Sequence, residues 1–209
     1  MKTRLALSMR VTSAHNYDEL RDSISHDWLM LCQEWNYEIV LVPNYISDPV
    51  QYINQFNING LILTGGDDIG AHQIRDQTEI EMLKYAINKK LPILGICRGL
   101  QLINFYFGGK TTPIRNHINI QHKIDIKKPF DKIYSNWIVT NSYHQQGVEL
   151  LNIGIGLTGW AFDAEGWVEA VYHNTHPIIG LMWHPERDKK NLQDKILIDS
   201  LLEGKLFWL

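Results

Sequence analysis

The sequence contains few cysteines, little net charge and no long apolar segment. Only two of its 209 residues are cysteine, which argues against a disulfide framework, so both thiols are expected to be free. The formal net charge of −3 gives no general attraction to nucleic acid or to a membrane surface. The N-terminal apolar run is too short for a signal peptide, and no stretch approaches the roughly 18 apolar residues of a membrane span. We therefore expect a cytoplasmic chain that binds neither nucleic acid nor membranes.

The length and composition fit a single globular unit. Of the 209 residues, 44% are hydrophobic and 21% are charged, which is ordinary for a globular protein. A chain of this length can bury one continuous core. Because no internal repeat, low-complexity tract or linker interrupts it, we predict one domain over residues 1–209.

Short apolar strands alternate with helical segments in the first half of the chain. Strands are predicted at residues 5–9, 38–42, 60–64 and 92–96, and helices at 17–35, 49–56, 76–90 and 99–107. This alternation is typical of a parallel sheet that is covered by helices on both faces.

After residue 110 the pattern changes to strands that are joined by turns. Strands are predicted at residues 118–126, 137–140, 153–158, 167–172 and 178–183, and a closing helix at 188–202. We expect these strands to extend the same sheet in antiparallel fashion. The predicted fold class is therefore α/β, with an open and mostly parallel sheet.

The two cysteines have different surroundings. Cys32 lies in the helical apolar stretch 28–35 and is predicted to be a buried core residue. Cys97 lies between Gly95 and Gly99, where an apolar strand is expected to turn into a helix. A nucleophile on such a bend has its side chain forced outward, and only small flanking residues let the backbone pass. Cys97 is therefore the candidate nucleophile.

The neighbours of Cys97 are suited to acyl transfer. A thiolate attacks carbonyl carbon far better than a thiol does, and the free N–H groups at the start of the next helix favour a negative sulfur. The backbone N–H of Arg98 is expected to donate to the oxyanion of a tetrahedral intermediate. A second backbone donor is expected from the glycine pair after the strand 60–64, at Gly66.

His184 and Glu186 are the candidate base and orienting carboxylate. His184 follows an apolar run and precedes Pro185, which favours extended geometry. In an extended chain residues i and i+2 point the same way, so Glu186 is expected to accept the ring N–H of His184 and fix its tautomer. Together with Cys97, these residues predict a catalytic triad.

Five ordered motifs resemble those of the class I glutamine amidotransferase superfamily, which has a Cys-His-Glu triad. They are TGGDD at 64–68, GICRGLQ at 95–101, NSYHQQGV at 141–148, GWVEA at 166–170 and WHPE at 183–186. The third and fourth are similar to the stand-alone γ-glutamyl hydrolases of the peptidase C26 type. The resemblance covers nearly the whole chain and implies a flavodoxin-like sheet.

The resemblance also implies a cysteine-dependent hydrolase of γ-glutamyl amide bonds that needs no cofactor and no metal. Cys97 would form a γ-glutamyl thioester, and His184 would protonate the leaving amine and later activate water. The glutamyl group would be held by Gly65, Gln101, Ser142, Tyr143 and His144. The expected partner is a small-molecule γ-glutamyl conjugate, and the oligomeric state stays open.

The leaving group stays open among nucleotide-linked amidates, polyamine-derived amines, GABA and folate polyglutamates. Residues 110–132 carry a local net charge of +4, which would attract a diphosphate. The basic residues of this segment are Lys110, Arg115, Lys123, Lys127, Lys128 and Lys132. We expect neutralisation of Lys127 and Lys128 to raise KM for a nucleotide conjugate. The side chains of Arg98 and His117 are further candidates to bind such a group.

Three other functions stay open. The 209 residues contain no synthetase domain that would accept ammonia, so the chain either hydrolyses its substrate alone or is a glutaminase subunit for a separate synthetase. A binding module without chemistry is disfavoured because all three triad residues are present. A metallohydrolase is disfavoured because no residue pair shows His-x-x-x-His or Cys-x-x-Cys spacing.

Overall fold

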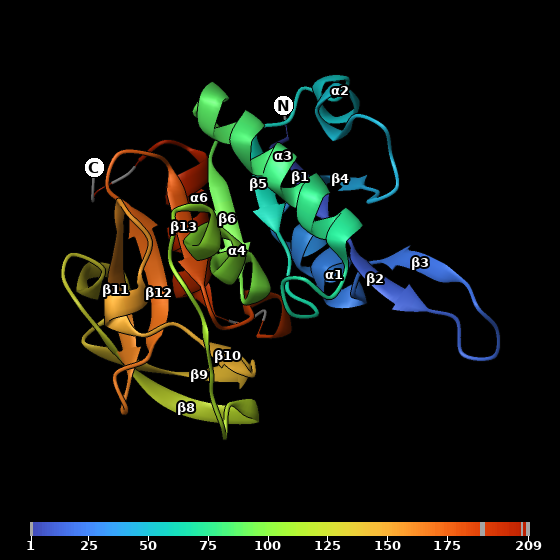
Figure 1. Cartoon of the computed structure of the whole chain (residues 1–209). Coiled ribbons are helices and arrows are strands. Elements are labelled where there is room, and N and C mark those ends of the chain that lie inside the picture. Colours follow the sequence, from blue (N-terminus) through green and yellow to red (C-terminus); the bar gives the residue numbers. More distant parts are fainter. Residues whose placement is uncertain (1, 189–190, 206, 208–209) are drawn as a thin grey trace.

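A nine-stranded mixed sheet organises the computed structural model, which describes residues 2–188, 191–205 and 207 (Figure 1). The strand order is β4-β1-β5-β6-β13-β12-β11-β8-β9. The first five strands in this order are mutually parallel, and from β13 to β9 each strand runs antiparallel to the next. The predicted α/β fold with an antiparallel extension is confirmed.

The five parallel strands are short and apolar. They are β4 (Glu38–Val42), β1 (Arg4–Ser8), β5 (Gly60–Leu63), β6 (Ile93–Ile96) and β13 (Ile178–Leu181). Every residue of β5, β6 and β13 is buried, because helices cover both faces of this part of the sheet.

Two groups of helices form a core on each face of the sheet. One face is covered by α1 (His26–Glu34) and α6 (Leu192–Leu202), and the other by α2 (Pro49–Asn54), α3 (Gln73–Lys89) and α4 (Arg98–Tyr106). Figure 1 shows α3 and α4 together on the near face. Cys32 of α1 is only 2% exposed, as predicted, and burial raises its pKa to about 12.

The antiparallel half contains longer strands and several short elements. Its strands are β12 (Val168–His173), β11 (Leu157–Asp163), β8 (Ile118–Ile126) and β9 (Trp137–Tyr143). The short elements are β7 (Thr112–Pro113), α5 (Asp131–Tyr134), β10 (Gln146–Gly147) and the 3-10 helices η1 (Leu150–Asn152) and η2 (Pro185–Arg187). β7 pairs with β10 beside the main sheet.

The helix predicted over residues 17–35 is wrong in its first half. β2 (Arg10–Ser13) and β3 (Leu20–Ser23) form a separate hairpin that projects from the sheet (Figure 1). The helix α1 begins only after Ser25, whose hydroxyl accepts a backbone N–H of the first turn and caps it. Leu20 is 64% exposed, so its agreement with the helical spacing is coincidental.

The strand predicted over residues 153–158 is also wrong for most of its length, since β11 begins only at its end. The N–H of Gly154 donates to Oδ1 of Asn104 at 2.8 Å. The N–H of Ile155 donates to the carbonyl oxygen of Phe107, also at 2.8 Å. These hydrogen bonds connect the segment to the end of α4, so its backbone does not pair within the sheet.

The closing helix predicted over residues 188–202 is present as α6, which begins after Asn191. Residues 189–190 of that prediction lie outside the described residues. The four-residue helix α5 was not predicted, because one turn is too short to show a helical period. Within the described parts of the chain, no helix is long and apolar enough to cross a membrane.

Candidate active site

Three neighbouring parallel strands end at the same edge of the sheet. β6 lies between β5 and β13 and is parallel to both. The residues that follow the three strands are therefore brought together: the pair Gly65 and Gly66 after β5, Cys97 after β6, and His184 after β13. Ligands of open α/β sheets bind at this carboxyl edge.

Cys97 occupies a strained bend between β6 and α4. Its φ of 51° and ψ of −103° lie in a region that non-glycine residues rarely adopt. Its N–H donates to the carbonyl oxygen of Leu181 at 2.7 Å, which ties the bend to β13. A Cβ on Gly95 would lie 2.6 Å from the carbonyl carbon of Gly99, and one on Gly99 would collide with the backbone of Leu63. The bend therefore requires both glycines.

His184 and Glu186 are in direct contact. Nδ1 of His184 lies 2.7 Å from Oε1 of Glu186, and both side chains are buried. The local geometry differs from the expected extended run, because only His184 is extended, with φ −113° and ψ 92°. The 3-10 turn η2 then brings Glu186 back toward the imidazole.

The surroundings of His184 favour its protonated form. Burial disfavours the charge, but the negative charge of Glu186, with a smaller effect of the neighbouring Cys97, outweighs it and raises the pKa of His184 to about 9. At neutral pH a cationic imidazole therefore lies beside the sulfur of Cys97. Cys97 also lies at the start of α4, next to the positive end of the helix dipole.

A buried arginine holds the glycine turn that follows β5. Nη2 of Arg75 donates to the carbonyl oxygen of Gly65 at 3.0 Å. A Cβ on Gly65 would lie 2.9 Å from Cε1 of His184, so the close approach to the imidazole depends on a residue without a side chain. Gly66, with φ 151°, lines the same cavity as Cys97.

The side chain of Arg98 is not available to a substrate. It is 2% exposed, and its guanidinium pairs with Asp76 and Glu79 of α3. Glu79 also accepts Nε of Arg75 at 3.0 Å, so a buried network joins the start of α4 to the glycine turn. The sequence left this side chain open as a candidate to bind a diphosphate, and the structure instead pairs it with these two carboxylates. Its backbone N–H, at the first position of α4, is separate from this network.

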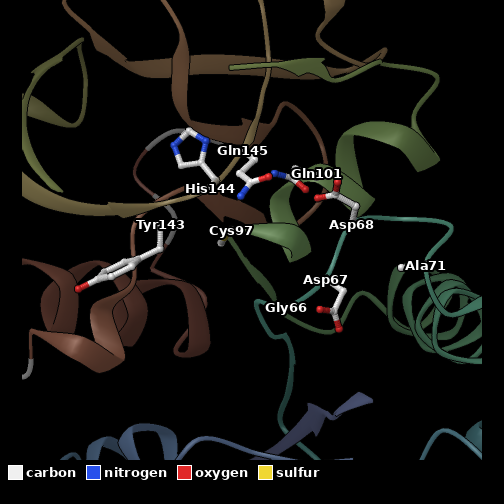
Figure 2. Close-up of a pocket in the computed structure, with 9 residues that line it drawn as sticks. All are labelled: Gly66, Asp67, Asp68, Ala71, Cys97, Gln101, Tyr143, His144 and Gln145. Atoms are coloured by element: carbon white, nitrogen blue, oxygen red, sulfur yellow. The ribbon is translucent and has the colours of Figure 1, made fainter. Parts of the chain in front are cut away.

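A cavity of about 390 Å³ opens beside Cys97 (Figure 2). It is lined by Gly66, Asp67, Asp68, Ala71, Cys97, Gln101, Tyr143, His144 and Gln145. Most of the expected substrate-binding residues thus face one space. Gly65 and Ser142 are not among the lining residues.

Gln101 and His144, which lie above Cys97 in Figure 2, are held by hydrogen bonds. Nε2 of Gln101 donates to the carbonyl oxygen of Gln146 at 3.0 Å, and Nδ1 of His144 lies 3.0 Å from the same oxygen. Ser142 is fully buried, and its hydroxyl donates to the carbonyl oxygen of His117 at 2.7 Å. The Ser142 side chain therefore supports the segment and does not line the cavity.

Sequence reasoning missed the role of Asn141. Its Oδ1 accepts the backbone N–H of His184 at 2.9 Å, and its Nδ2 donates to the carbonyl oxygen of His184 at 3.0 Å. Tyr143 of the same strand packs edge-on against the imidazole, with ring centroids 5.6 Å apart. The motif at 141–148 draws attention to this segment, but no spacing rule links an amide to a backbone 43 residues later.

The charge of the cavity wall also differs from expectation. Asp67 and Asp68 line it, and among the described residues no lysine or arginine lines it. Nζ of Lys127 instead lies 6.0 Å from the ring centroid of Phe162. His117 is 5% exposed and hydrogen-bonded within the protein. The wall of this cavity therefore does not supply the basic groups expected for a diphosphate.

Comparison with known proteins gives first the fold and then the family of the chain. The whole fold matches the crystal structure of a glutamine amidotransferase from Thermotoga maritima, with a TM-score of 0.66 over 99% of this chain and 86% of that one, at 13% identity. The Peptidase C26 family model matches residues 7–186, and the chain belongs to this family.

Two relatives extend this comparison. The chain is 29% identical over 195 residues to the gamma-glutamyl-CDP-amidate hydrolase of Campylobacter jejuni. This match covers 88% of this chain and 90% of that protein. It is 35% identical over 160 residues to a Schizosaccharomyces pombe protein provisionally named a glutamine amidotransferase. That match spans 62% of each chain.

Proposed function

We propose that the chain hydrolyses a γ-glutamyl amide bond through a thioester on Cys97. The observation that carries this proposal is the strained bend that presents Cys97 beside His184, whose Nδ1 lies 2.7 Å from Glu186. Membership of the Peptidase C26 family supports hydrolysis of a C–N bond. Nucleophile, base and orienting carboxylate then form a triad.

The chemical steps follow from this arrangement. The thiolate of Cys97 attacks the γ-carbonyl carbon, and the N–H groups of Gly66 and Arg98 donate to the oxyanion that forms. As the tetrahedral intermediate collapses, His184 gives its proton to the leaving nitrogen, and the C–N bond breaks. His184 then takes a proton from water, the hydroxide attacks the thioester, and the C–S bond breaks to release glutamate.

The glutamyl group occupies the cavity beside Cys97. Gln101 and His144 line it, and both are oriented by the carbonyl oxygen of Gln146. Polar side chains and backbone groups of the segment around Tyr143 suit the amino and carboxylate groups of a zwitterion. The Gly65 turn contributes space, since a side chain there would meet the imidazole.

We propose γ-glutamyl-CDP-amidate as the substrate, with glutamate and cytidine diphosphoramidate as products. This product would serve the modification of capsular polysaccharide. The similarity to the Campylobacter jejuni hydrolase over 88% of the chain supports this choice. The acidic wall formed by Asp67 and Asp68 favours a second candidate, a γ-glutamyl conjugate of a cationic amine such as a polyamine.

A panel of γ-glutamyl conjugates tests both candidates. Glutamate release is measured with γ-glutamyl-CDP-amidate, γ-glutamyl-putrescine, γ-glutamyl-GABA, a folate polyglutamate and glutamine. We expect the nucleotide conjugate to give the highest kcat/KM. A preference for the putrescine conjugate would favour the second candidate. If glutamine were the only substrate hydrolysed, and only when a synthetase was added, both candidates would give way to an ammonia-supplying subunit.

A further inference from the structure

Four ionisable side chains converge in the antiparallel half of the sheet, outside the proposed triad. His117 precedes β8, His122 lies within it, Asp163 ends β11, and Glu169 lies in β12. One ligand atom from each lies within 4.8 Å of all the others. Asp163 and Glu169 are buried, as is His117. The triad mechanism gives none of them a role.

The hydrogen bonds of His117 place a lone pair against a carboxylate. Its Nδ1 lies 2.9 Å from the carbonyl oxygen of Arg115, which can only accept, so Nδ1 carries a proton. Its Nε2 lies 3.0 Å from Oδ2 of Asp163, which is also an acceptor. A neutral His117 therefore repels Asp163 unless a cation lies between them.

Glu169 also requires a cation beside its carboxylate. Glu169 is completely buried, with 0% of its surface exposed to solvent. Neither of its carboxylate oxygens has a hydrogen-bond partner within the described residues. Nε2 of His122 lies 3.7 Å from Oε2, and Nε2 of His144 lies 3.5 Å from Oε1. Nδ1 of His144 lies against a backbone carbonyl oxygen and must donate to it, so a neutral His144 also turns the lone pair of Nε2 toward Glu169. A buried, unpaired carboxylate is costly without a positive charge beside it.

We propose that His117, His122, Asp163 and Glu169 bind a zinc ion. Two imidazole nitrogens and two carboxylate oxygens are ligands that Zn²⁺ accepts, and in a tetrahedral site they lie roughly 3.4 Å apart. The contacts of 3.0 and 3.7 Å within the cluster are close to that spacing. Two carboxylates and neutral imidazoles balance the charge of one divalent ion. If protons on the imidazoles balanced the charge instead, positively charged rings would lie close together. The ring centroid of His117 lies 5.1 Å from that of His122 and 5.0 Å from that of His144.

The ion would hold the wall of the substrate cavity. It would join β8, β11 and β12 through the four ligands. The carbonyl oxygen of His117 accepts both the hydroxyl of Ser142 at 2.7 Å and the N–H of His144 at 3.1 Å. A fixed His117 therefore positions the segment that lines the cavity, and the zinc has no part in bond cleavage.

Metal binding is tested on the untagged full chain that carries Cys97→Ser, so that the thiol does not compete for the ion. Zn²⁺ is titrated by calorimetry after dialysis against a chelator, and Co²⁺ by absorption spectroscopy. We expect one ion per chain and a Co²⁺ spectrum of a tetrahedral site without thiolate. His122→Gln in the same background is expected to weaken Zn²⁺ binding at least about tenfold. His15→Gln, at an exposed position of the hairpin, is the matched control and is expected to bind normally.

Two results would overturn the site. One is binding of less than about one-fifth of a Zn²⁺ ion per Cys97→Ser chain. This measurement does not depend on whether any further variant folds. The other is equal affinity of His122→Gln and His15→Gln. Neither measurement depends on hydrolysis, so failure to bind zinc would leave the proposed γ-glutamyl hydrolase activity standing. Absence of that activity would likewise leave the zinc site standing.

Discussion

In the parallel half of the sheet, the residues proposed to react lie within three residues of the ends of buried strands, whereas the antiparallel half contributes residues held by side-chain hydrogen bonds. Cys97 and His184 stand at the ends of β6 and β13, which are neighbours. Asn141 belongs to β9, four strands from β13 in the sheet order, yet it makes two hydrogen bonds to the His184 backbone. The parallel half thus presents the residues proposed to react, and the antiparallel half holds them in position.

The largest effect is expected in the parallel half, at the nucleophile. Cys97→Ala should lower kcat by at least about 10³-fold, because thioester formation is lost. The fold should persist, since the bend depends on Gly95 and Gly99 and not on the sulfur. Glutamate release and circular dichroism measure the two outcomes. Retention of more than about a tenth of the activity would exclude Cys97 as nucleophile.

The two partners of the nucleophile should differ. In the proposed mechanism, His184→Ala removes the group that moves the proton, whereas Glu186→Gln removes only the charge that orients and stabilises the imidazole. We expect Glu186→Gln to lose about one to two orders of magnitude less in kcat than His184→Ala. Equal or reversed losses, measured on the same substrate, would mean that these roles are assigned wrongly.

The positioning role of the antiparallel half is tested at Asn141. Asn141→Ala leaves the buried N–H and carbonyl oxygen of His184 without their partners and should lower kcat by about 10- to 100-fold. Asn141→Asp is the matched control, because its oxygen still accepts the N–H, and it should lose less. If both variants kept wild-type kcat, the division between the two halves would not hold.

The charge of His184 also predicts a pH dependence of stability. Its pKa is raised from 6.5 to about 9, so its contribution to folding is complete below pH 6.5 and is lost as the pH rises through 9. The free energy of unfolding of the wild type should fall over that interval relative to His184→Gln. Urea unfolding of both proteins at several pH values measures the difference. Parallel curves would show that His184 is not stabilised as a cation.

The smallest effect is expected from Lys127 and Lys128. The sequence suggested that they attract a diphosphate, but neither lines the cavity. Replacement of both by Gln should therefore leave KM unchanged for γ-glutamyl-CDP-amidate and for γ-glutamyl-anilide. A rise in KM for the nucleotide conjugate alone would restore the original expectation and place the diphosphate near the segment that follows β8.

Much of the parallel half could be predicted because its signals are local. The glycines around Cys97, the apolar strand before it and the amphipathic helix after it are all close to Cys97 in the sequence. The antiparallel half was harder to predict. The amphipathic spacing of residues 17–35 and the apolar run 153–158 are equally local, and both misled, because a cap at Ser25 and hydrogen bonds to the end of α4 override them.

By itself the sequence determined the α/β class, and short patterns of residue type predicted Cys97, His184 and Glu186 as the proposed nucleophile, base and carboxylate. Only the tertiary structure decided which groups surround them. The clamp of Asn141 on His184, the burial of Arg98 between Asp76 and Glu79, and the convergence of His117, His122, Asp163 and Glu169 join distant segments. Such contacts depend on strand order and register, and no local spacing encodes them.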